Sequence, residues 1–180
     1  MFVLCLVNTY DKLKLHEIHL RSIARAAPLC YAFGLHLALL DFPFWKERDE
    51  VVKAVRDYTT IGEHGRYLEE LDKSGKFHLI EKIPAHFGVL VATTSKPDEG
   101  KRISTDDVPS LTSATFLMGL GRKGLPKELM KKAKYHWDVT GKGVSLETCA
   151  AMGVIAALVG CKHGGHKDLP DSRILQGRKL

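Results

Sequence analysis

Residues 116–160 read FLMGLGRKGLPKELMKKAKYHWDVTGKGVSLETCAAMGVIAALVG, and this stretch decides the fold. It opens with a short apolar segment, Phe116 to Met118, that predicts a buried strand. A glycine-rich loop follows, and then the pattern predicts a helix over Pro126 to Ala133, a strand over Tyr135 to Val139 and a long apolar helix over Ser145 to Val159. Strands that alternate with helices favour an α/β fold with a mostly parallel sheet.

The upstream residues continue this alternation. Short apolar runs predict four further strands, over Leu4 to Val7, Leu35 to Leu40, Phe77 to Ile83 and Gly88 to Thr93. Helical spacing runs from His16 to Ala27, where Pro28 predicts a kink or a break, and Arg48 to Ser74 predicts two helices parted near Gly62 to Gly65. We therefore expect a single α/β domain over residues 1–160, with helices on both faces of the sheet.

Composition limits the classes of protein that the chain can represent. Of its 180 residues, 44% are hydrophobic and 27% are charged, as in globular domains, and the N-terminal apolar run is too short for a signal peptide or a membrane span. The four cysteines are widely spaced, which favours a reducing, cytoplasmic location. The net charge of +6 suits an anionic partner such as nucleic acid, and residues 161–180 read as a basic tail.

The loop that begins at Gly119 has two interpretations. It matches G-x-G-x-x-G through Gly121 and Gly124, which is the pattern of a dinucleotide site. However, the motif begins too late in the chain to be followed by the strands that hold the second half of a dinucleotide. Glycines also allow a sharp turn and a close approach of the backbone to a flat ligand, so an adenine or methionine moiety fits equally well.

The same stretch resembles the two C-terminal motifs of the SPOUT, or α/β-knot, superfamily of S-adenosylmethionine-dependent RNA methyltransferases. The matching segments are GLGRKGLP, HWDVTGKGVSL and ETCAAMGVIAALV, and VLVATTSKP resembles the preceding strand and loop. The resemblance implies a C-terminal deep trefoil knot, formed when the chain after Val139 threads back. It also implies a homodimer and an RNA substrate, with tRNA before rRNA. The chain would be a divergent, stand-alone member.

The resemblance also implies a cofactor pocket made by three loops that would bind S-adenosyl-L-methionine. Its predicted residues are Thr93, Thr94, Met118, Gly119, Leu120, Gly121, Gly124, Leu125, Val139, Thr140, Val144, Ser145 and Leu146. Basic residues beside this pocket are predicted to hold RNA phosphates, namely Arg122, Lys123, Lys127 and Lys131.

Two positions depart from the family motifs. Gly121 stands where the family has a glutamate, and Glu147 stands where it has the asparagine of S-L-N. These departures leave the methyl acceptor open between a ribose 2′-hydroxyl and a base nitrogen. The candidate catalytic residues are Arg25, by resemblance, and Glu147, as a general base or as a carboxylate that attracts the sulfonium. Alternatively, Glu147 is an acidic residue at the start of a helix, where the helix dipole favours negative charge. Ser145 is a candidate cap of the same helix.

The alternatives at this point belong to other classes of protein. A knotted protein that binds the cofactor or RNA without transferring a methyl group is the first, and a dinucleotide-dependent oxidoreductase is a distant second. No metal site is expected, because Cys161, His163 and His166 match none of the common zinc spacings.

Overall fold

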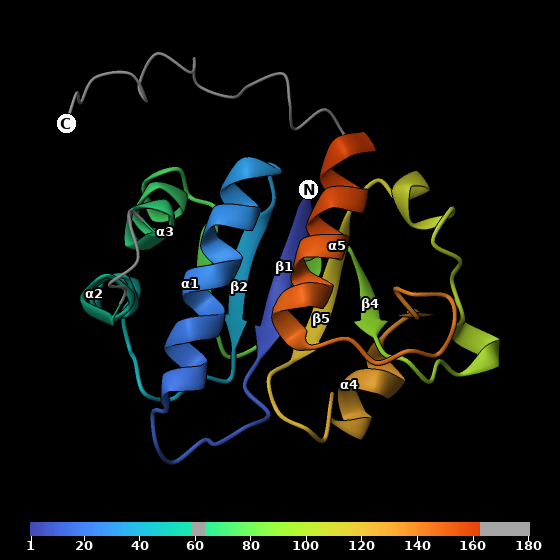
Figure 1. The fold of residues 1–180 in the computed structure, drawn as a ribbon, viewed down its shortest axis with the longest axis horizontal. Helices are drawn as coiled ribbons and strands as arrows, with labels where there is room; N and C mark the ends of the chain where they lie inside the picture. The colour runs from blue at the N-terminus through green and yellow to red at the C-terminus, as the bar shows by residue number, and fades with distance from the viewer. Residues whose placement is uncertain (59–63, 163–180) are drawn as a thin grey trace.

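The computed structural model describes residues 1–58 and 64–162. Its six parallel strands form one sheet in the order β3-β2-β1-β5-β4-β6 (Figure 1). The strands are β1 (Phe2–Val7), β2 (His36–Leu40), β3 (Phe77–Ile80), β4 (Val89–Thr93), β5 (Ala114–Gly119) and β6 (Tyr135–Trp137). The predicted α/β class and parallel sheet are therefore confirmed. The predicted tail lies outside the described residues, apart from Cys161 and Lys162, which end the last helix.

Helices lie between most of the strands. They are α1 (Glu17–Ala32), α2 (Arg48–Tyr58), α3 (His64–Lys73), α4 (Lys127–Lys132) and α5 (Thr148–Lys162), with 3₁₀ turns η1 (Ala85–Phe87), η2 (Glu99–Lys101) and η3 (Val108–Ser110).

Helix α1 passes through Pro28, where a kink or a break was expected. Proline removes one backbone hydrogen bond from a helix. Here the buried face of α1, which includes Ala24, Ala27 and Cys30, packs in the main core on both sides of the proline. Burial of this small-residue face holds the helix together as far as Ala32. Gly34 follows with a φ of 69°, a conformation that glycine adopts without strain.

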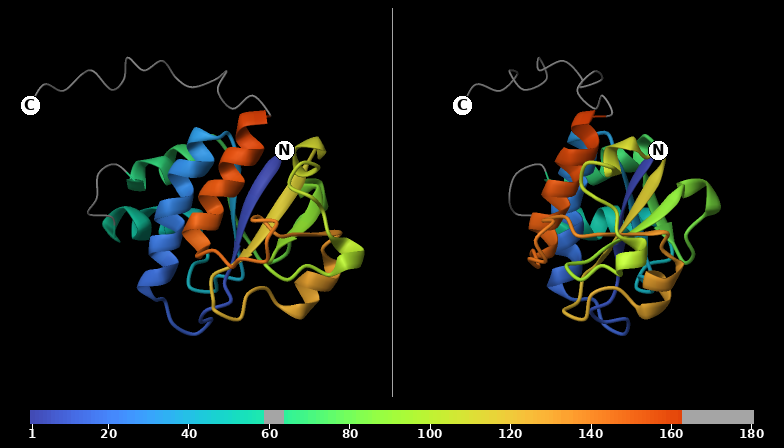
Figure 2. Two further views of the ribbon diagram at one scale, coloured as in Figure 1. Left: turned by 45° about the vertical axis from the view of Figure 1, so that its right-hand side comes forward. Right: turned by 90° about the vertical axis from the view of Figure 1, so that its right-hand side faces the viewer.

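The two faces of the sheet are covered unequally. Helices α1 and α5 lie side by side over one face, and α2 and α3 pack beside α1 near β2 and β3 (Figure 2). The large core beneath them includes Leu4, Phe116 and Ile155. The opposite face has a smaller core of alternating strand residues, covered by Phe87 of η1 and Leu129 of α4. Helices thus lie on both faces, but one layer is much thinner.

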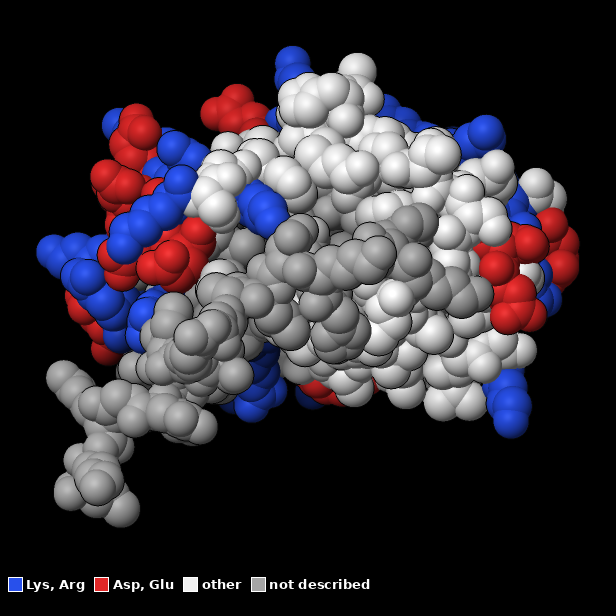
Figure 3. All heavy atoms as spheres, turned by 90° about the horizontal axis from the view of Figure 1, so that it is seen from above, with Lys and Arg blue, Asp and Glu red and all other residues white. Residues whose placement is uncertain are grey.

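Because all six strands are parallel, their carboxyl ends lie at one edge of the sheet. This edge is at the bottom of Figure 1, where the arrowheads of the strands point. Ligands in open α/β sheets bind outside this edge. Figure 3 looks onto the opposite end, where acidic and basic side chains gather together on the left, the side of α2 and α3.

Candidate functional site

The glycine-rich loop after β5 packs closely on Thr9, the second residue after β1. The Gly121 amide donates a hydrogen bond to Thr9 Oγ1 over 2.8 Å. A Cβ atom at Gly121 would lie 2.4 Å from the Thr9 carbonyl oxygen, and a Cβ atom at Gly119 would lie 2.8 Å from the backbone of Gly124. Side chains at these two positions would push the loops apart, so the glycines are needed for close packing of backbone on backbone.

Gly124 and the glycines of the 138–147 loop have a different role. Gly124, Gly141 and Gly143 all have φ values between 65° and 70°, in the left-handed region. A Cβ atom at Gly124 or Gly141 would meet no atom within 4 Å, and one at Gly143 would meet only the Ser95 carbonyl oxygen at 3.7 Å. These glycines turn the chain beside open space, and their backbones can approach a ligand.

Asp138 organises the loop that follows β6. Its buried carboxylate accepts hydrogen bonds from the Gly143 amide at 2.6 Å, from the Thr140 amide at 3.1 Å and from the Thr140 hydroxyl at 2.8 Å. Burial raises the pKa of Asp138, but the hydrogen bonds from Gly143 and Thr140 outweigh it, and the net pKa lies below the ordinary value. The sequence interpretation missed Asp138, although a carboxylate directly after a buried strand is a usable signal.

Thr93 and Thr94, at the end of β4, form hydrogen bonds to the neighbouring strands β5 and β6. The Thr94 amide donates to the Trp137 carbonyl oxygen over 3.0 Å, and the Thr93 hydroxyl donates to the Leu117 carbonyl oxygen over 2.8 Å. The Thr148 hydroxyl, at the start of α5, donates to the Gly119 carbonyl oxygen over 3.4 Å. The three segments predicted to form a pocket, 91–95, 118–125 and 139–146, therefore lie together at one edge.

The apolar residues predicted for the pocket have different surroundings. Met118 and Leu120 are buried in the main core, so that only their backbones remain for a ligand. Leu125 packs against the smaller core. Val144 and Leu146 are exposed, and Val139, Thr140, Thr93 and Thr94 are partly buried.

Arg25 and Glu147 come from α1 and from the residue before α5, and both lie next to Cys149. The Arg25 guanidinium donates to Cys149 Sγ over 3.6 Å, and this contact, followed by the attraction of the Cys149 and Glu147 charges, raises the pKa of Arg25. Glu147 Oε2 accepts hydrogen bonds from the Cys149 amide at 2.8 Å and from the Ala150 amide at 3.3 Å. Glu147 therefore acts as the cap of α5.

The expected capping role of Ser145 is wrong. Helix α5 begins at Thr148 and not at Ser145, and the Glu147 carboxylate accepts the hydrogen bonds of two amides in its first turn. Ser145 is exposed, and Glu147 bonds to the free amides of the first turn instead.

Sequence reasoning also missed a polar cluster after β1. His19 is buried, and its Nδ1 accepts a hydrogen bond from the His16 amide at 2.9 Å, so Nε2 carries the proton and donates to Asn8 Oδ1 at 3.0 Å. Burial is the main cause of the lowered pKa of His19. Asp11 Oδ2 lies 2.7 Å from His16 Nε2, and this hydrogen bond lowers the pKa of Asp11. The signal in the sequence was the run of polar residues directly after a buried strand.

The basic residues predicted to hold RNA are all exposed. Arg122 and Lys123 belong to the glycine-rich loop, and Lys127 and Lys131 belong to α4. Lys101 anchors the end of this short helix, since its ammonium group donates to the carbonyl oxygens of Lys131 at 2.6 Å and Ala133 at 2.9 Å. Within the described residues, no helix is long and apolar enough to cross a bilayer.

Comparison with known proteins identifies relatives across nearly the whole chain. A family model described as protein of unknown function DUF531 matches residues 2–160. A curated relative, an uncharacterised protein of Methanocaldococcus jannaschii, is 48% identical over 161 residues, which cover 88% of this chain and 92% of the relative.

Solved structures with a similar fold include methyltransferases. One, described as giving structural insight into the 2-OH methylation of C/U34 on tRNA, is 16% identical and superposes with a TM-score of 0.57, covering 91% of this chain and 97% of the other. The SpoU methyltransferase AviRb from Streptomyces viridochromogenes, in complex with AdoMet, is 15% identical with a TM-score of 0.56, covering 91% of this chain and 57% of that chain. At 15% and 16% identity, these similarities show a shared fold and no more.

Proposed function

Since this chain belongs to the DUF531 family, we propose that it is an S-adenosylmethionine-dependent RNA methyltransferase and a divergent member of the SPOUT superfamily. The observation that carries the proposal is the meeting of segments 91–95, 118–125 and 139–146 at the carboxyl edge of the sheet. Two proteins of similar fold support it, one described for tRNA methylation and one bound to AdoMet.

We also propose that the chain forms a trefoil knot, in which the residues after Val139 thread back through the loop made by residues 94–113. Two contacts of that loop support this path. The Trp137 indole nitrogen, in β6, donates to Thr105 Oγ1 over 3.1 Å, and η3 packs against α5. The loop thus contacts the chain both before and after the proposed crossing.

The residues of the three loops fit the chemistry of the cofactor. The glycine backbones beside open space at Gly124 and Gly141 can approach a flat adenosyl group. The Ser145 hydroxyl and the acceptor side of the Thr93 hydroxyl offer hydrogen bonds, whereas the Thr140 hydroxyl orders its own loop. The Glu147 carboxylate adds negative charge near this site, which favours a sulfonium cation. When bound, S-adenosylmethionine supplies an electrophilic methyl group.

In this proposal the protein aligns the acceptor and assists the loss of its proton. Arg25 is proposed to contact the acceptor or a neighbouring phosphate, because its guanidinium lies at the seam of α1 and α5, beside Cys149. Glu147 is proposed to act mainly by electrostatic attraction, since its carboxylate already bonds to two amides of α5. The acceptor is a 2′-hydroxyl or a base nitrogen of RNA.

Calorimetric titration with S-adenosylmethionine, S-adenosylhomocysteine and NAD tests the cofactor site. We expect both adenosyl ligands to bind and Gly124→Trp to abolish their binding, because the indole would fill the space beside the loop. Gly75→Trp is the matched control, since Gly75 also has a left-handed φ of 69° beside open space but lies between α3 and β3. Binding of NAD alone, or unchanged adenosyl binding in Gly124→Trp, would contradict the proposal.

A knotted binding protein without transferase activity is the second candidate. The engagement of Glu147 as a helix cap and the presence of Gly121 in place of an acidic residue favour it. Methyl transfer from labelled cofactor to bulk tRNA and rRNA, taken from a strain that lacks the gene, separates the two candidates. Incorporation that Arg25→Ala removes while cofactor affinity is retained supports the enzyme.

We further propose that the protein is a homodimer that packs through α1 and α5. The outward side of α5 supports this, because Val154 is 39% exposed and Ala150 is exposed, while the helix has no charged residue between Thr148 and Cys161. Sedimentation is expected to give twice the monomer mass, and Val154→Glu is expected to yield monomers.

A further inference from the structure

The loop of residues 9–15, directly after β1, is built rigidly from its own polar groups. The buried Asn8 side chain donates to the Asp11 carbonyl oxygen over 2.8 Å. Asp11 Oδ1 accepts hydrogen bonds from the Leu13 amide at 2.8 Å and from the Lys14 amide at 3.2 Å, while Oδ2 bonds to His16. These hydrogen bonds hold the backbone of the loop in one conformation before any partner binds.

This loop exposes large apolar side chains. Tyr10 is 51% exposed and Leu13 is 96% exposed. The Tyr10 ring is held edge-on to two histidine rings, with centroid distances of 5.2 Å to His16 and 5.8 Å to His19. The fixed ring would lose little conformational entropy when a partner packs on it.

Tyr10 also lies next to the proposed cofactor site. The preceding residue, Thr9, accepts the hydrogen bond of the Gly121 amide, and its carbonyl oxygen lies against the Gly121 backbone. A base stacked on Tyr10 would therefore lie next to any group that is bound at the 119–124 loop.

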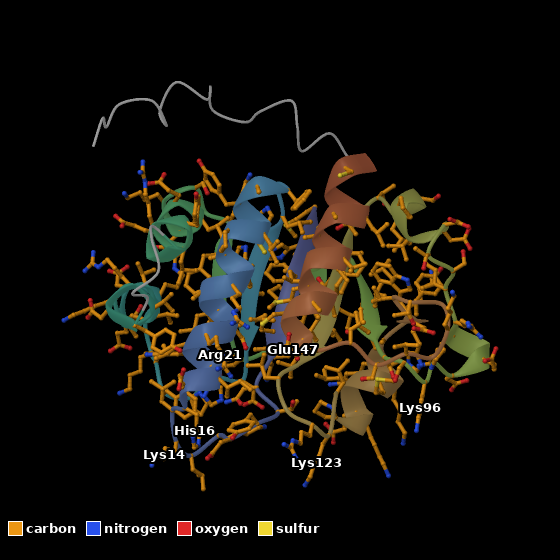
Figure 4. The ribbon with its side chains drawn as sticks, in the orientation of Figure 1. Lys14, His16, Arg21, Lys96, Lys123 and Glu147 are labelled. Carbon is orange, nitrogen blue, oxygen red and sulfur yellow. The ribbon has the colours of Figure 1, made fainter. Side chains whose placement is uncertain are left out.

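The charges around Tyr10 favour an anionic partner. Lys14 and Lys123 lie along the same lower edge, as does Lys96 (Figure 4). Among the described residues, no ion pair is recorded for these three lysines, whereas Lys12 is paired with Asp41. Lys14 belongs to the same loop as Tyr10, and Lys123 belongs to the loop whose Gly121 amide bonds to Thr9. An exposed aromatic ring near lysines can bind single-stranded nucleic acid, by base stacking and phosphate attraction.

We propose that Tyr10 is a stacking platform for an unpaired RNA base next to the nucleotide to be methylated. The substrate is then a single-stranded loop or end, and not a continuous duplex. Lys14 and Lys123 hold the flanking phosphates. This inference rests on the proposed RNA methyltransferase function and narrows its substrate class.

The test is fluorescence anisotropy with a labelled single-stranded RNA of twelve mixed nucleotides and with the same strand in a duplex. Tyr10→Ala and Tyr10→Leu are expected to weaken single-strand binding about tenfold, because both remove the aromatic face on which a base stacks. Tyr10→Phe should bind like the unchanged protein, and duplex affinity should be lower and indifferent to all three changes.

Leucine is the decisive control, because it keeps apolar surface without an aromatic face. Full single-strand affinity in Tyr10→Leu, or equal losses for the duplex, would overturn the proposal. Melting temperatures of the variants exclude unfolding as the cause. As a direct readout, photocrosslinking of 5-iodouridine RNA should attach to Tyr10, and crosslinks confined to other residues would also overturn it.

The failure of this inference is distinguishable from failure of the proposed function. Titration of S-adenosylmethionine into the Tyr10 variants reports on the cofactor site alone and should be unchanged. If the adenosyl ligands do not bind but single-strand affinity still depends on Tyr10, the methyltransferase assignment fails and the stacking platform stands.

Discussion

At the scale of single residues, Asp138 has the most direct consequence for the site. One carboxylate holds Thr140 and Gly143 and so fixes the loop that would border the cofactor. We expect Asp138→Asn to lower the free energy of unfolding by about 1–3 kcal/mol at pH 7, because an amide cannot accept all of these hydrogen bonds. The Asp57→Asn change on α2, where the side chain is exposed, should change it little. Urea unfolding measures both.

The pH dependence of this effect has a definite sign. The pKa of Asp138 in the folded protein lies below its ordinary value of 3.8, because its hydrogen bonds outweigh burial. Its contribution to stability is therefore fully present above about pH 4 and is lost as the pH falls through the folded pKa. The stability difference between the unchanged protein and Asp138→Asn should be constant from pH 7 to 5 and shrink below 4. A difference that grows on acidification would contradict this assignment.

The sequence predicted individual site residues unevenly. Glycine positions such as Gly119 and Gly121 follow from a motif, because only glycine permits the close approach of the Gly124 backbone at the first and of Thr9 at the second. The Asn8–His19 bond and the Asp11–His16 bond join residues through loop geometry, which has no periodic signature. The role of Glu147 as the cap depended on where α5 begins, a boundary that local pattern defines poorly.

At the scale of elements, α5 carries two glycines with opposite expectations. A Cβ atom at Gly153 would meet nothing within 4 Å, whereas one at Gly160 would lie 2.6 Å from Phe33 Cβ and 2.8 Å from its carbonyl oxygen. Gly153→Ala should therefore stabilise the protein by about 0.5–1 kcal/mol through helix propensity. Gly160→Ala should destabilise it by roughly 1–3 kcal/mol through overpacking.

Urea unfolding at several protein concentrations measures this pair of variants. If Gly153→Ala destabilises the protein and shifts it toward monomers, a second copy contacts Gly153, and the proposed dimer surface gains support. If Gly160→Ala proves stabilising, the close contact between α5 and the end of α1 is wrong.

The order of the elements was predictable because buried strands and amphipathic helices have distinct periods. The residues at which the elements end were less predictable. Of the kink or break expected at Pro28, a break does not occur, because packing of Ala27 and Cys30 outweighs one lost hydrogen bond. Strand β3 was predicted to reach Ile83 but ends at Ile80, because its pairing with β2 stops at Leu40 and the charged residues Glu81 and Lys82 follow.

At the scale of the whole molecule, the distribution of charge matters more than its sum. The carboxyl edge carries Arg122, Lys123 and Lys127. If these side chains contact RNA phosphates, removal of Lys123 and Lys127 together should reduce the slope of log affinity against log salt by about 1.4 for single-stranded RNA. Removal of Lys53 and Lys73, on α2 and α3, should leave the slope unchanged. Equal slopes for the two double variants would contradict this placement of the RNA.

The strand order has a consequence for how the chain reaches its fold. β1 is a central strand that pairs with β2 on one side and with β5 on the other, so that Phe2 lies opposite Ala114. Contacts so distant in sequence slow folding, because a long loop must close before pairing repays its entropy. During synthesis, one edge of β1 stays unpaired until residues 114–119 have been made. We expect slow refolding that is sensitive to truncation after β3, and an N-terminal half that depends on chaperones until β5 is made.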